Sequence, residues 1–319
     1  MGTKPGLTAR NAKEAGCPMS KLKAIDPKTA EPSKSKILVY GKPGVGKTWT
    51  SLDFPSVYYL DTEGGANLSH YTDKLKKSGG AYFGPDQGSQ DFGEVVGQLK
   101  ALATEEHQYR TVIIDSLSKV YNNEIAKEME RLGDKDAFGA SKKAAVRLTR
   151  QLINWIDRID LNVILICHEK PVWANGEQTG VTFDAWEKLE YELHLCLNIQ
   201  KQGASRKARV AKSRLEAFPD GTLFDWSYEE FAKLYGTEIL EGKSKVLILA
   251  KPEQVEEIKY LVDLLKVDPD TIGKWMEKAK SETWAEMESS KIQACIDMLK
   301  KKLNPEKLEE KATKKVKVA

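Results

Sequence analysis

A glycine-rich segment that follows a short apolar run limits the folds open to this 319-residue chain more than any other feature. The segment Gly41–Thr48 matches the pattern G-x-x-x-x-G-K-[ST] at every fixed position, and Ile37–Tyr40 before it is typical of a buried strand. In a phosphate-binding loop of this kind, backbone N–H groups of the turn point at phosphate oxygens. The alternative is a glycine loop that matches by chance, and the preceding strand argues against it. We therefore predict that the chain binds a nucleoside triphosphate.

The residues of this loop have predicted roles in holding ATP and Mg²⁺. Gly41, Gly44 and Gly46 let the backbone turn tightly. Lys47 places a positive charge on the β- and γ-phosphates, and the hydroxyl of Thr48 can bind Mg²⁺. The predicted nucleotide-binding residues of this segment are Gly41, Lys42, Pro43, Gly44, Val45, Gly46, Lys47, Thr48 and Trp49.

Composition excludes several classes of protein. Hydrophobic residues make up 40% of the chain and charged residues 30%, which suits an apolar core under a water-facing surface. No apolar run approaches the roughly 18 residues of a membrane span, and no apolar signal segment begins the chain. The four cysteines are far apart, so neither a zinc site nor a disulfide framework is indicated. We expect a cytoplasmic protein without a membrane partner, and the net charge of +3 identifies no other partner.

The pattern from residue 36 to 235 predicts an α/β domain. Short apolar runs alternate there with helical stretches, which favours a mostly parallel sheet covered by helices on both faces. The clearest helix is Ala140–Ile159, with one apolar face. The expected strands are Ile37–Tyr40, Val57–Leu60, Thr111–Asp115, Val163–Cys167 and His194–Ile199, with Arg209–Lys212 as a further candidate.

A small helical module is predicted for residues 236–303. Its helices are expected to begin at Pro252 and to cover Asp270–Ala279 and Ser289–Leu303. Residues 1–35 are predicted to be a disordered basic arm, and residues 304–319 a disordered Lys-rich tail, because neither has enough apolar residues for a core.

Two carboxylates follow predicted strands and suit ATP hydrolysis. Asp115 ends the run Val112–Asp115, where it could hold Mg²⁺, or it could cap the helix that follows. Glu63 follows Asp61 after another strand and could orient the attacking water, or it could be a solvated loop acid. His168 follows a further strand, where it could sense the γ-phosphate or serve only the structure.

These segments together resemble the core of RecA-type recombinases. The order is Gly41–Thr48, then Leu60–Gly65, then Ile113–Ser116, then Ile166–Glu169. It is most similar to phage AAA-family ATPases described as single-strand annealing proteins. The resemblance covers roughly residues 36–235 and implies a RecA-like P-loop core, with Lys47 and Thr48 on phosphate and Mg²⁺, Asp115 as the Walker B acid and Glu63 as the catalytic glutamate. The predicted C-terminal helical module follows this core. His168 stands where RecA-type proteins carry a polar γ-phosphate sensor, usually glutamine.

The segment Lys201–Arg214 is rich in basic residues and contains no acid. Such a run is commonly a solvated face, here a β-hairpin with a basic loop. Its end, Lys212–Phe218, resembles the RecA segment whose basic pair reaches the ATP of the neighbouring subunit. One residue separates Lys212 from Arg214, which puts both on one face of a strand. The resemblance implies that this pair is catalytic in trans, with Arg214 as an arginine finger.

A DNA-binding surface is expected near the same end of the domain. RecA-type proteins contact single-stranded DNA with the loop after the sensor, here Glu169–Gly180, where Lys170 could meet a phosphate and Trp173 could stack on a base. An ordinary connection with a half-buried tryptophan is the alternative. Arg206 and Lys207 of the basic run are the other predicted DNA contacts. A stripe formed by Lys143, Arg147 and Arg150, and the loop-like segment Leu132–Gly139, could contribute, although a solvated helix face also explains the stripe.

The leading hypothesis is an ATP-binding and ATP-hydrolysing protein of DNA recombination or annealing, with ATP and Mg²⁺ as cofactors. It would assemble as a homo-oligomeric ring or filament on single-stranded DNA and could work with a single-strand-binding protein. A non-catalytic, ATP-locked DNA scaffold and a hexameric helicase core are the alternatives. ATPase rates with and without DNA would distinguish the first alternative, and strand displacement the second.

Overall fold

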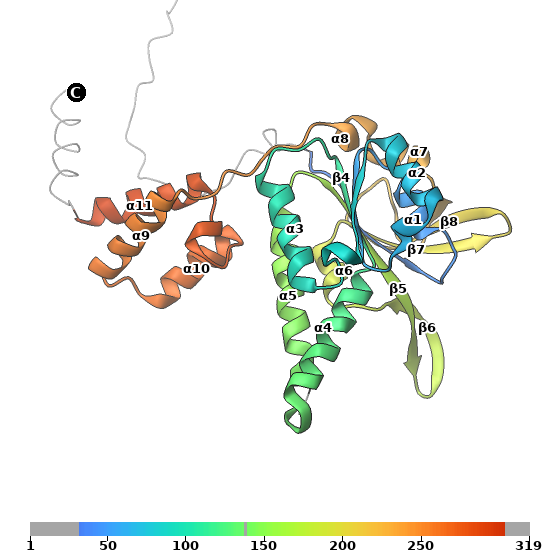
Figure 1. Ribbon diagram of the computed structural model, residues 1–319, viewed down its shortest axis with the longest axis horizontal. Helices are drawn as coiled ribbons and strands as arrows, with labels where there is room; N and C mark the ends of the chain where they lie inside the picture. Colours follow the sequence, from blue (N-terminus) through green and yellow to red (C-terminus); the bar gives the residue numbers. More distant parts are fainter. Residues whose placement is uncertain (1–31, 137–138, 304–319) are drawn as a thin grey trace, which may run out of the picture. The chain divides into compact units, whose positions relative to one another are not determined.

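The computed structural model describes residues 32–136 and 139–303 (Figure 1). The predicted Lys-rich tail and nearly all of the predicted basic arm lie outside the described residues. Lys34 and Ser35, which the sequence pattern places in the arm, have only 6% and 0% of their surface exposed. The packed part of the chain therefore already includes Lys34.

Helices separate the successive strands from β1 to β5, and every strand expected from the sequence is confirmed. The strands are β1 (Lys36–Gly41), β2 (Val57–Asp61), β3 (Ala81–Phe83), β4 (Thr111–Asp115), β5 (Asn162–Ala174), β6 (Glu177–Phe183), β7 (Leu195–Gln202), β8 (Ser205–Ser213) and β9 (Leu223–Asp225). The α-helices are α1 (Lys47–Ser51), α2 (Ser69–Ser78), α3 (Phe92–Thr104), α4 (Leu117–Leu132), α5 (Ala140–Arg158), α6 (Leu189–Glu192), α7 (Tyr228–Tyr235), α8 (Thr237–Glu241), α9 (Pro252–Leu264), α10 (Pro269–Ala279) and α11 (Ser289–Leu303).

The strands of the described residues form one mixed sheet. Its order is β3-β2-β4-β5-β1-β7-β8-β9, with β6 paired to β5 beside this path. The pairs from β3 across to β7 are parallel, whereas β5 with β6, β7 with β8 and β8 with β9 are antiparallel. The prediction of a mostly parallel α/β sheet is thus confirmed, and the carboxyl ends of β1, β2 and β4 lie at one edge.

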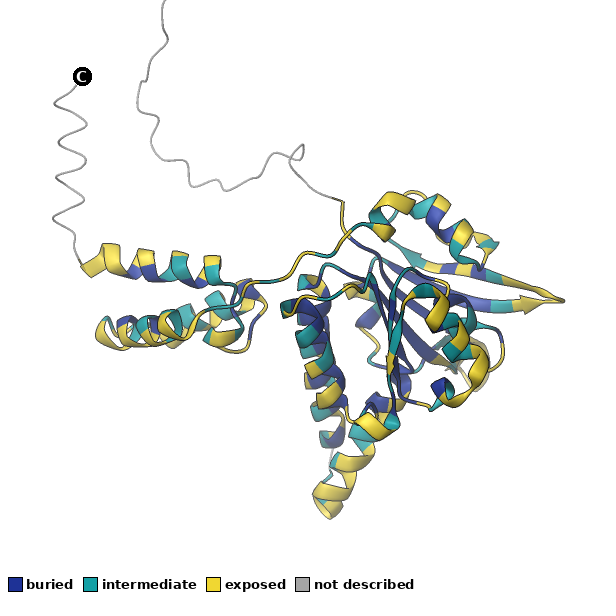
Figure 2. Ribbon diagram, turned by 45° about the horizontal axis from the view of Figure 1, so that its top comes forward, coloured by how far each residue is buried: buried dark blue, intermediate teal, exposed yellow. Residues whose placement is uncertain are grey.

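Alternating side chains of the central strands enter two separate cores, as the two-residue period of a strand requires. Leu38 and Val163 face the core with α3, α4 and α5, whereas Ile37 and Ile164 face the core with α2 and α7. Both faces are therefore covered, and strands β1, β2 and β4 are buried almost throughout (Figure 2). This explains why the sequence shows continuous apolar runs there rather than alternation.

Helix α8 packs on the α/β core, although it follows the predicted boundary at residue 235. Leu240 is fully buried in the same cluster as β1. The ammonium of Lys34 donates hydrogen bonds to the carbonyls of Ile239 and Gly242. The core therefore extends at least to Leu240.

The amide of Asn162 connects α8 to the start of the sheet. Its Oδ1 accepts hydrogen bonds from the backbone N and Oγ of Ser35, both at 3.2 Å. Its Nδ2 donates to the carbonyls of Arg110 and Leu240, at 3.0 and 2.8 Å. Asn162 is fully buried, so these groups have no access to water.

We predict that Asn162→Ala lowers the free energy of unfolding by about 2–4 kcal/mol, because it leaves several buried polar groups without partners. Urea unfolding followed by circular dichroism measures this change. The matched control is Asn122→Ala, which removes an exposed hydrogen bond to Asp184 and should cost less than about 1 kcal/mol. Equal stability of the two variants would contradict the connecting role of Asn162.

The segment after His168 is a β-hairpin, not the predicted loop. β5 continues to Ala174 and pairs with β6, and Asn175 and Gly176 form the turn with φ angles of 53° and 83°. Asn-Gly is the residue pair most typical of two-residue hairpin turns, because both positions need positive φ. The polar composition of the segment hides the strands from a search for apolar runs.

The C-terminal helices α9, α10 and α11 confirm the three expected helical patterns. Their apolar side chains form a cluster of their own, which includes Ile258, Leu261, Ile292 and Ile296. The module thus has a core separate from the two cores of the sheet.

Candidate functional site

The segments singled out in the sequence meet at the carboxyl edge of the parallel strands. The phosphate-binding loop connects β1 to α1, and Gly41 lies opposite His168 in the register of β1 and β5. Asp61 at the end of β2 lies opposite Asp115 at the end of β4. Open α/β sheets bind their ligands at this edge.

The loop is closely packed at both of its ends. A Cβ atom on Gly41 would lie 2.4 Å from the carbonyl oxygen of Ile199, so no larger residue fits there. The ammonium of Lys47 donates to the carbonyls of Gly41 and Lys42, at 2.8 and 3.0 Å. Burial lowers the pKa of Lys47, and the negative charge of Asp115 opposes this effect. Lys47 therefore lies inside the turn, where phosphate oxygens would bind.

The remaining loop residues divide into exposed and packed positions. Lys42, Pro43 and Gly44 are exposed, whereas Val45 packs into the core beneath. Trp49 points toward α2, and the ammonium of a lysine on that helix, Lys74, lies 3.9 Å from the centre of its ring. The predicted nucleotide contact of Trp49 stays a prediction.

Asp115 and Thr48, the residues predicted to hold Mg²⁺, contact each other. The Thr48 hydroxyl donates a hydrogen bond to Oδ2 of Asp115 at 2.5 Å, and the Tyr59 hydroxyl donates to the same oxygen at 3.0 Å. Burial raises the pKa of Asp115 to about 6, although these two hydrogen bonds oppose the rise. Ser116, rather than Asp115, caps α4 by accepting a hydrogen bond from Lys119, which removes the capping alternative.

The donor atoms fit Mg²⁺, which prefers oxygen ligands and commonly takes one or two from protein and the rest from phosphates and water. Thr48 would supply a hydroxyl ligand, and the Asp115 carboxylate would accept hydrogen bonds from bound water. In the described part of the chain no group of three or more His, Cys, Asp or Glu side chains could hold a metal. The phosphates of a nucleotide would therefore have to complete the coordination.

Glu63, Ser116 and His168 form a contact triangle next to this pair. Oε1 of Glu63 lies 2.6 Å from both Ser116 Oγ and His168 Nε2, and the latter two atoms are 3.2 Å apart. A carboxylate only accepts hydrogen bonds, so His168 Nε2 carries a proton. Burial acts to raise the pKa of Glu63, but the hydrogen bonds from Ser116 and His168 and the charge of Lys47 outweigh it, and the pKa is lowered. Glu63 is thus an ionised base connected to the predicted sensor.

Asp61 fixes the turn that carries Glu63. Its carboxylate accepts hydrogen bonds from the backbone N–H groups of Glu63, Gly64, Gly65 and Ala66, at 2.7–3.2 Å. Sequence reasoning assigned no role to Asp61, Tyr59 or Ser116. The signal for Asp61 is its position two residues before Glu63 with two glycines following, a common arrangement for a side chain that caps a turn.

Lys212 and Arg214 lie at the opposite end of the sheet from the loop of their own chain. Ser213 between them pairs with Leu195 at the start of β7. Lys212 donates to the carbonyl of Leu193, and the guanidinium of Arg214 donates to the carbonyl of Tyr191. Both side chains therefore contact the short segment Tyr191–Leu193. Arg214 is exposed. A role in the ATP site of their own chain does not fit this placement.

The predicted DNA contacts lie on two hairpins. Trp173 is 62% exposed on the β5–β6 hairpin, which projects from the sheet (Figure 1). A half-buried tryptophan is therefore excluded. Lys170 lies on the same strand, 3.7 Å from Asp184. Arg206 and Lys207 lie on the β7–β8 hairpin, and Lys207 forms an ion pair with Asp225 at 2.7 Å.

Comparison with protein families gives a match to the part of the chain that contains this site. A family model described as an AAA domain matches residues 33–215, more than half of the chain. The chain belongs to the AAA domain family. The matched segment contains the phosphate-binding loop, Glu63, Asp115 and His168, and it ends directly after Arg214. Membership in the AAA domain family supports a P-loop ATPase that binds nucleotide.

Other comparisons add little to the AAA domain assignment. A search of curated proteins finds no match. Among solved structures, the crystal structure of the RadB recombinase is similar to the chain at 19% sequence identity and a TM-score of 0.40. This similarity covers 60% of the chain and 87% of that structure. No helix in the described residues of this AAA domain protein combines the length and apolar content that crossing a membrane requires.

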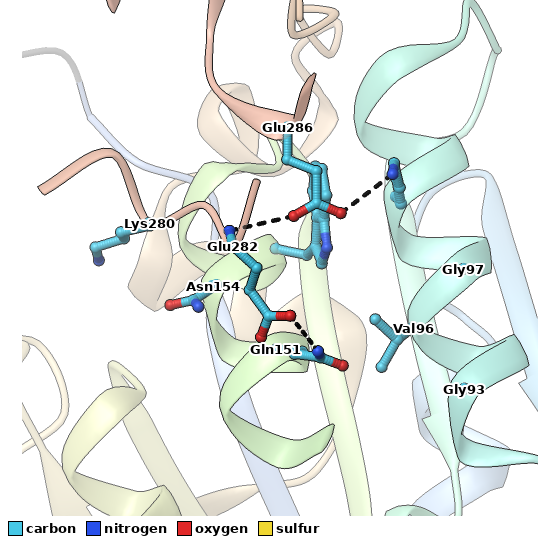
Figure 3. Close-up of a pocket in the computed structure, with 10 residues that line it drawn as sticks. Gly93, Val96, Gly97, Gln151, Asn154, Lys280, Glu282 and Glu286 are labelled. Carbon is cyan, nitrogen blue, oxygen red and sulfur yellow. Dashed lines mark hydrogen bonds and ion pairs between the residues drawn. The ribbon is translucent and has the colours of Figure 1, made fainter. Parts of the chain in front are cut away.

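A cavity of about 200 Å³ lies away from this edge, between α3, α5 and residues 280–286 (Figure 3). Lys100 and Glu286 form an ion pair across it at 3.1 Å, and Gln151 donates a hydrogen bond to Glu282. Ligand pockets commonly enclose roughly 300–1,000 Å³. The cavity is therefore too small for ATP.

Proposed function

We propose that this AAA domain protein hydrolyses ATP in an assembly on single-stranded DNA and acts in DNA recombination or annealing. The observation that carries the proposal is the triangle of Glu63, Ser116 and His168 beside the phosphate-binding loop. A loop that only bound nucleotide would need no ionised carboxylate at this place. The resemblance to RecA-type recombinases supports the step from ATP hydrolysis to DNA.

Each residue of the site would have a different role in phosphoryl transfer. Lys47 would hold the β- and γ-phosphates, and Thr48 with Asp115 would hold Mg²⁺, which neutralises the charge that develops on the phosphates. Glu63 would accept a hydrogen bond from the attacking water and orient it. Because His168 contacts Glu63 directly, a change in the position of either side chain alters the other.

The predicted sensor, His168, lies on strand β5, which is also the first strand of the predicted DNA-binding hairpin. His168 and Trp173 both lie on β5, five residues apart, with one shift in the pairing register between Val172 and Trp173. A nucleotide that moved His168 would therefore also act on the strand that carries Trp173 and Lys170. This connection gives a physical route by which DNA on the hairpin would stimulate ATP hydrolysis.

We predict that the affinity for single-stranded DNA falls steeply with salt, because basic side chains displace counterions from phosphates. Trp173→Ala should weaken binding by about 1–3 kcal/mol per stacked base without a change in the salt dependence. Lys170→Ala should instead reduce the slope of log K against log salt concentration by about 0.7. Fluorescence anisotropy with a labelled oligonucleotide over a salt series measures both effects.

Tyr260→Ala is the matched control for this experiment, because Tyr260 is 65% exposed on α9 and belongs to no predicted DNA contact. It should bind DNA as the wild type does. Absence of binding by the wild type, or an affinity independent of salt, would contradict the proposed DNA surface.

A further inference from the structure

The side chain of Arg206 crosses the phosphate-binding loop of its own chain. A Cβ atom on Gly46 would lie 2.1 Å from Nε and 2.4 Å from Cδ of Arg206. These distances are far below van der Waals contact, so the arginine runs directly over the backbone of Gly46. The glycine is necessary here for a second reason, since its φ angle is 92°.

The guanidinium of Arg206 carries a charge without a partner. Among the described residues no hydrogen bond or ion pair engages this group, whereas Lys207 next to it is paired with Asp225. The nearby ammonium of Lys74 is already paired with Asp53 at 2.7 Å. Burial lowers the pKa of Lys74 most, Asp53 opposes this effect, and the positive charge of Arg206 adds a smaller lowering. An unpaired guanidinium over a phosphate-binding turn can bind an anion there.

The order of the strands indicates which part of a nucleotide Arg206 would meet. Asp115 and His168, which would surround the γ-phosphate, come from β4 and β5 on one side of β1. Arg206 comes from β8, on the other side of β1. A nucleotide whose γ-phosphate lies toward β4 and β5 therefore has its α-phosphate and nucleoside toward β8.

We propose that Arg206 binds the α- and β-phosphates of the nucleotide held by its own chain. The proposal rests on the proposed function, since it needs a nucleotide in the loop Gly41–Thr48. It replaces the DNA contact expected from the basic run. Strand β8 would then carry a contact to its own nucleotide at one end and, through Lys212 and Arg214, a contact to the neighbouring nucleotide at the other end.

The test is the affinity for ADP with Mg²⁺, measured by isothermal titration calorimetry in the absence of DNA. ADP keeps the α- and β-phosphates and excludes turnover. Arg206→Ala should weaken binding about 10- to 100-fold, as expected for loss of hydrogen bonds to a charged group. Arg206→Lys, which keeps the charge without the planar fork, should recover part of the affinity.

Arg209→Ala is the matched control. Arg209 lies on the same strand three residues away, so its side chain is on the opposite face of the sheet. It should change the affinity for ADP less than about 3-fold, which corresponds to less than ~0.7 kcal/mol. Arg206 and Arg209 are both exposed, and thermal melting without nucleotide should be the same for both variants.

The results for ADP binding distinguish failure of the role of Arg206 from failure of the proposed function. If the wild type binds ADP and Arg206→Ala binds it equally well, the proposal is overturned, and a loss confined to DNA affinity would assign Arg206 to DNA. If the wild type itself does not bind ADP, the proposed function fails at the phosphate-binding loop, and the role of Arg206 fails with it.

Discussion

Glu63→Gln is expected to bind ATP with near wild-type affinity and to lose ATP turnover by about 10²–10⁴-fold. Glutamine keeps the shape of the side chain and can still contact Ser116, but it has no negative charge. It therefore cannot act as a base toward water, and the interaction with the proton on His168 Nε2 weakens. Steady-state phosphate release and nucleotide affinity, measured on the same preparation, separate the two effects.

Glu169→Gln is the control for that experiment. Glu169 follows His168 directly in β5, and its carboxylate accepts a hydrogen bond from Asn198 rather than from the triangle. This variant should hydrolyse ATP within about threefold of the wild type, as expected for an acid outside the reaction. Turnover by Glu63→Gln equal to that of Glu169→Gln would remove Glu63 from the catalytic site.

The parts of the fold that were predictable are those coded by short segments. The phosphate-binding loop is a fixed pattern after an apolar run, and the buried parallel strands are continuous apolar runs of three to five residues. The carboxylate Asp115 follows from its place at the end of such a run. In each case the chemistry depends on residues that are close in the chain.

The parts that were not predictable depend on contacts between distant segments. Tyr59 reaches Asp115 from the neighbouring strand, and Ser116 connects Glu63 to His168. No local pattern distinguishes these hydroxyls from others in the chain. The position of Arg206 over Gly46 likewise requires the strand order, because 160 positions of sequence separate the two residues and only the sheet places β8 near the loop.

Arg214→Ala is expected to bind ATP nearly as the wild type does and to lose turnover by about 10³–10⁵-fold, the range typical of arginine fingers. The physical reason is its location, since Arg214 lies at the end of the sheet opposite its own phosphate-binding loop. It would neutralise transition-state charge only in the site of a neighbouring copy. Folding should be unaffected because the side chain is exposed.

The comparison variant is Lys47→Ala, which removes the charge on the β- and γ-phosphates and should abolish nucleotide binding in its own loop. It leaves Arg214 intact. The two variants are therefore defective in different halves of one shared site. Gel filtration of the mixture establishes whether they assemble together.

ATP turnover by mixtures of Arg214→Ala and Lys47→Ala tests the central claim most directly, namely that the chain hydrolyses ATP in a site completed by a second copy. In a mixed assembly, the intact loop of an Arg214→Ala chain meets the intact arginine of a Lys47→Ala chain. The account predicts that turnover rises above the sum of the two variants and is highest at intermediate ratios. Turnover that never exceeds this sum, in mixtures that do assemble together, would contradict it.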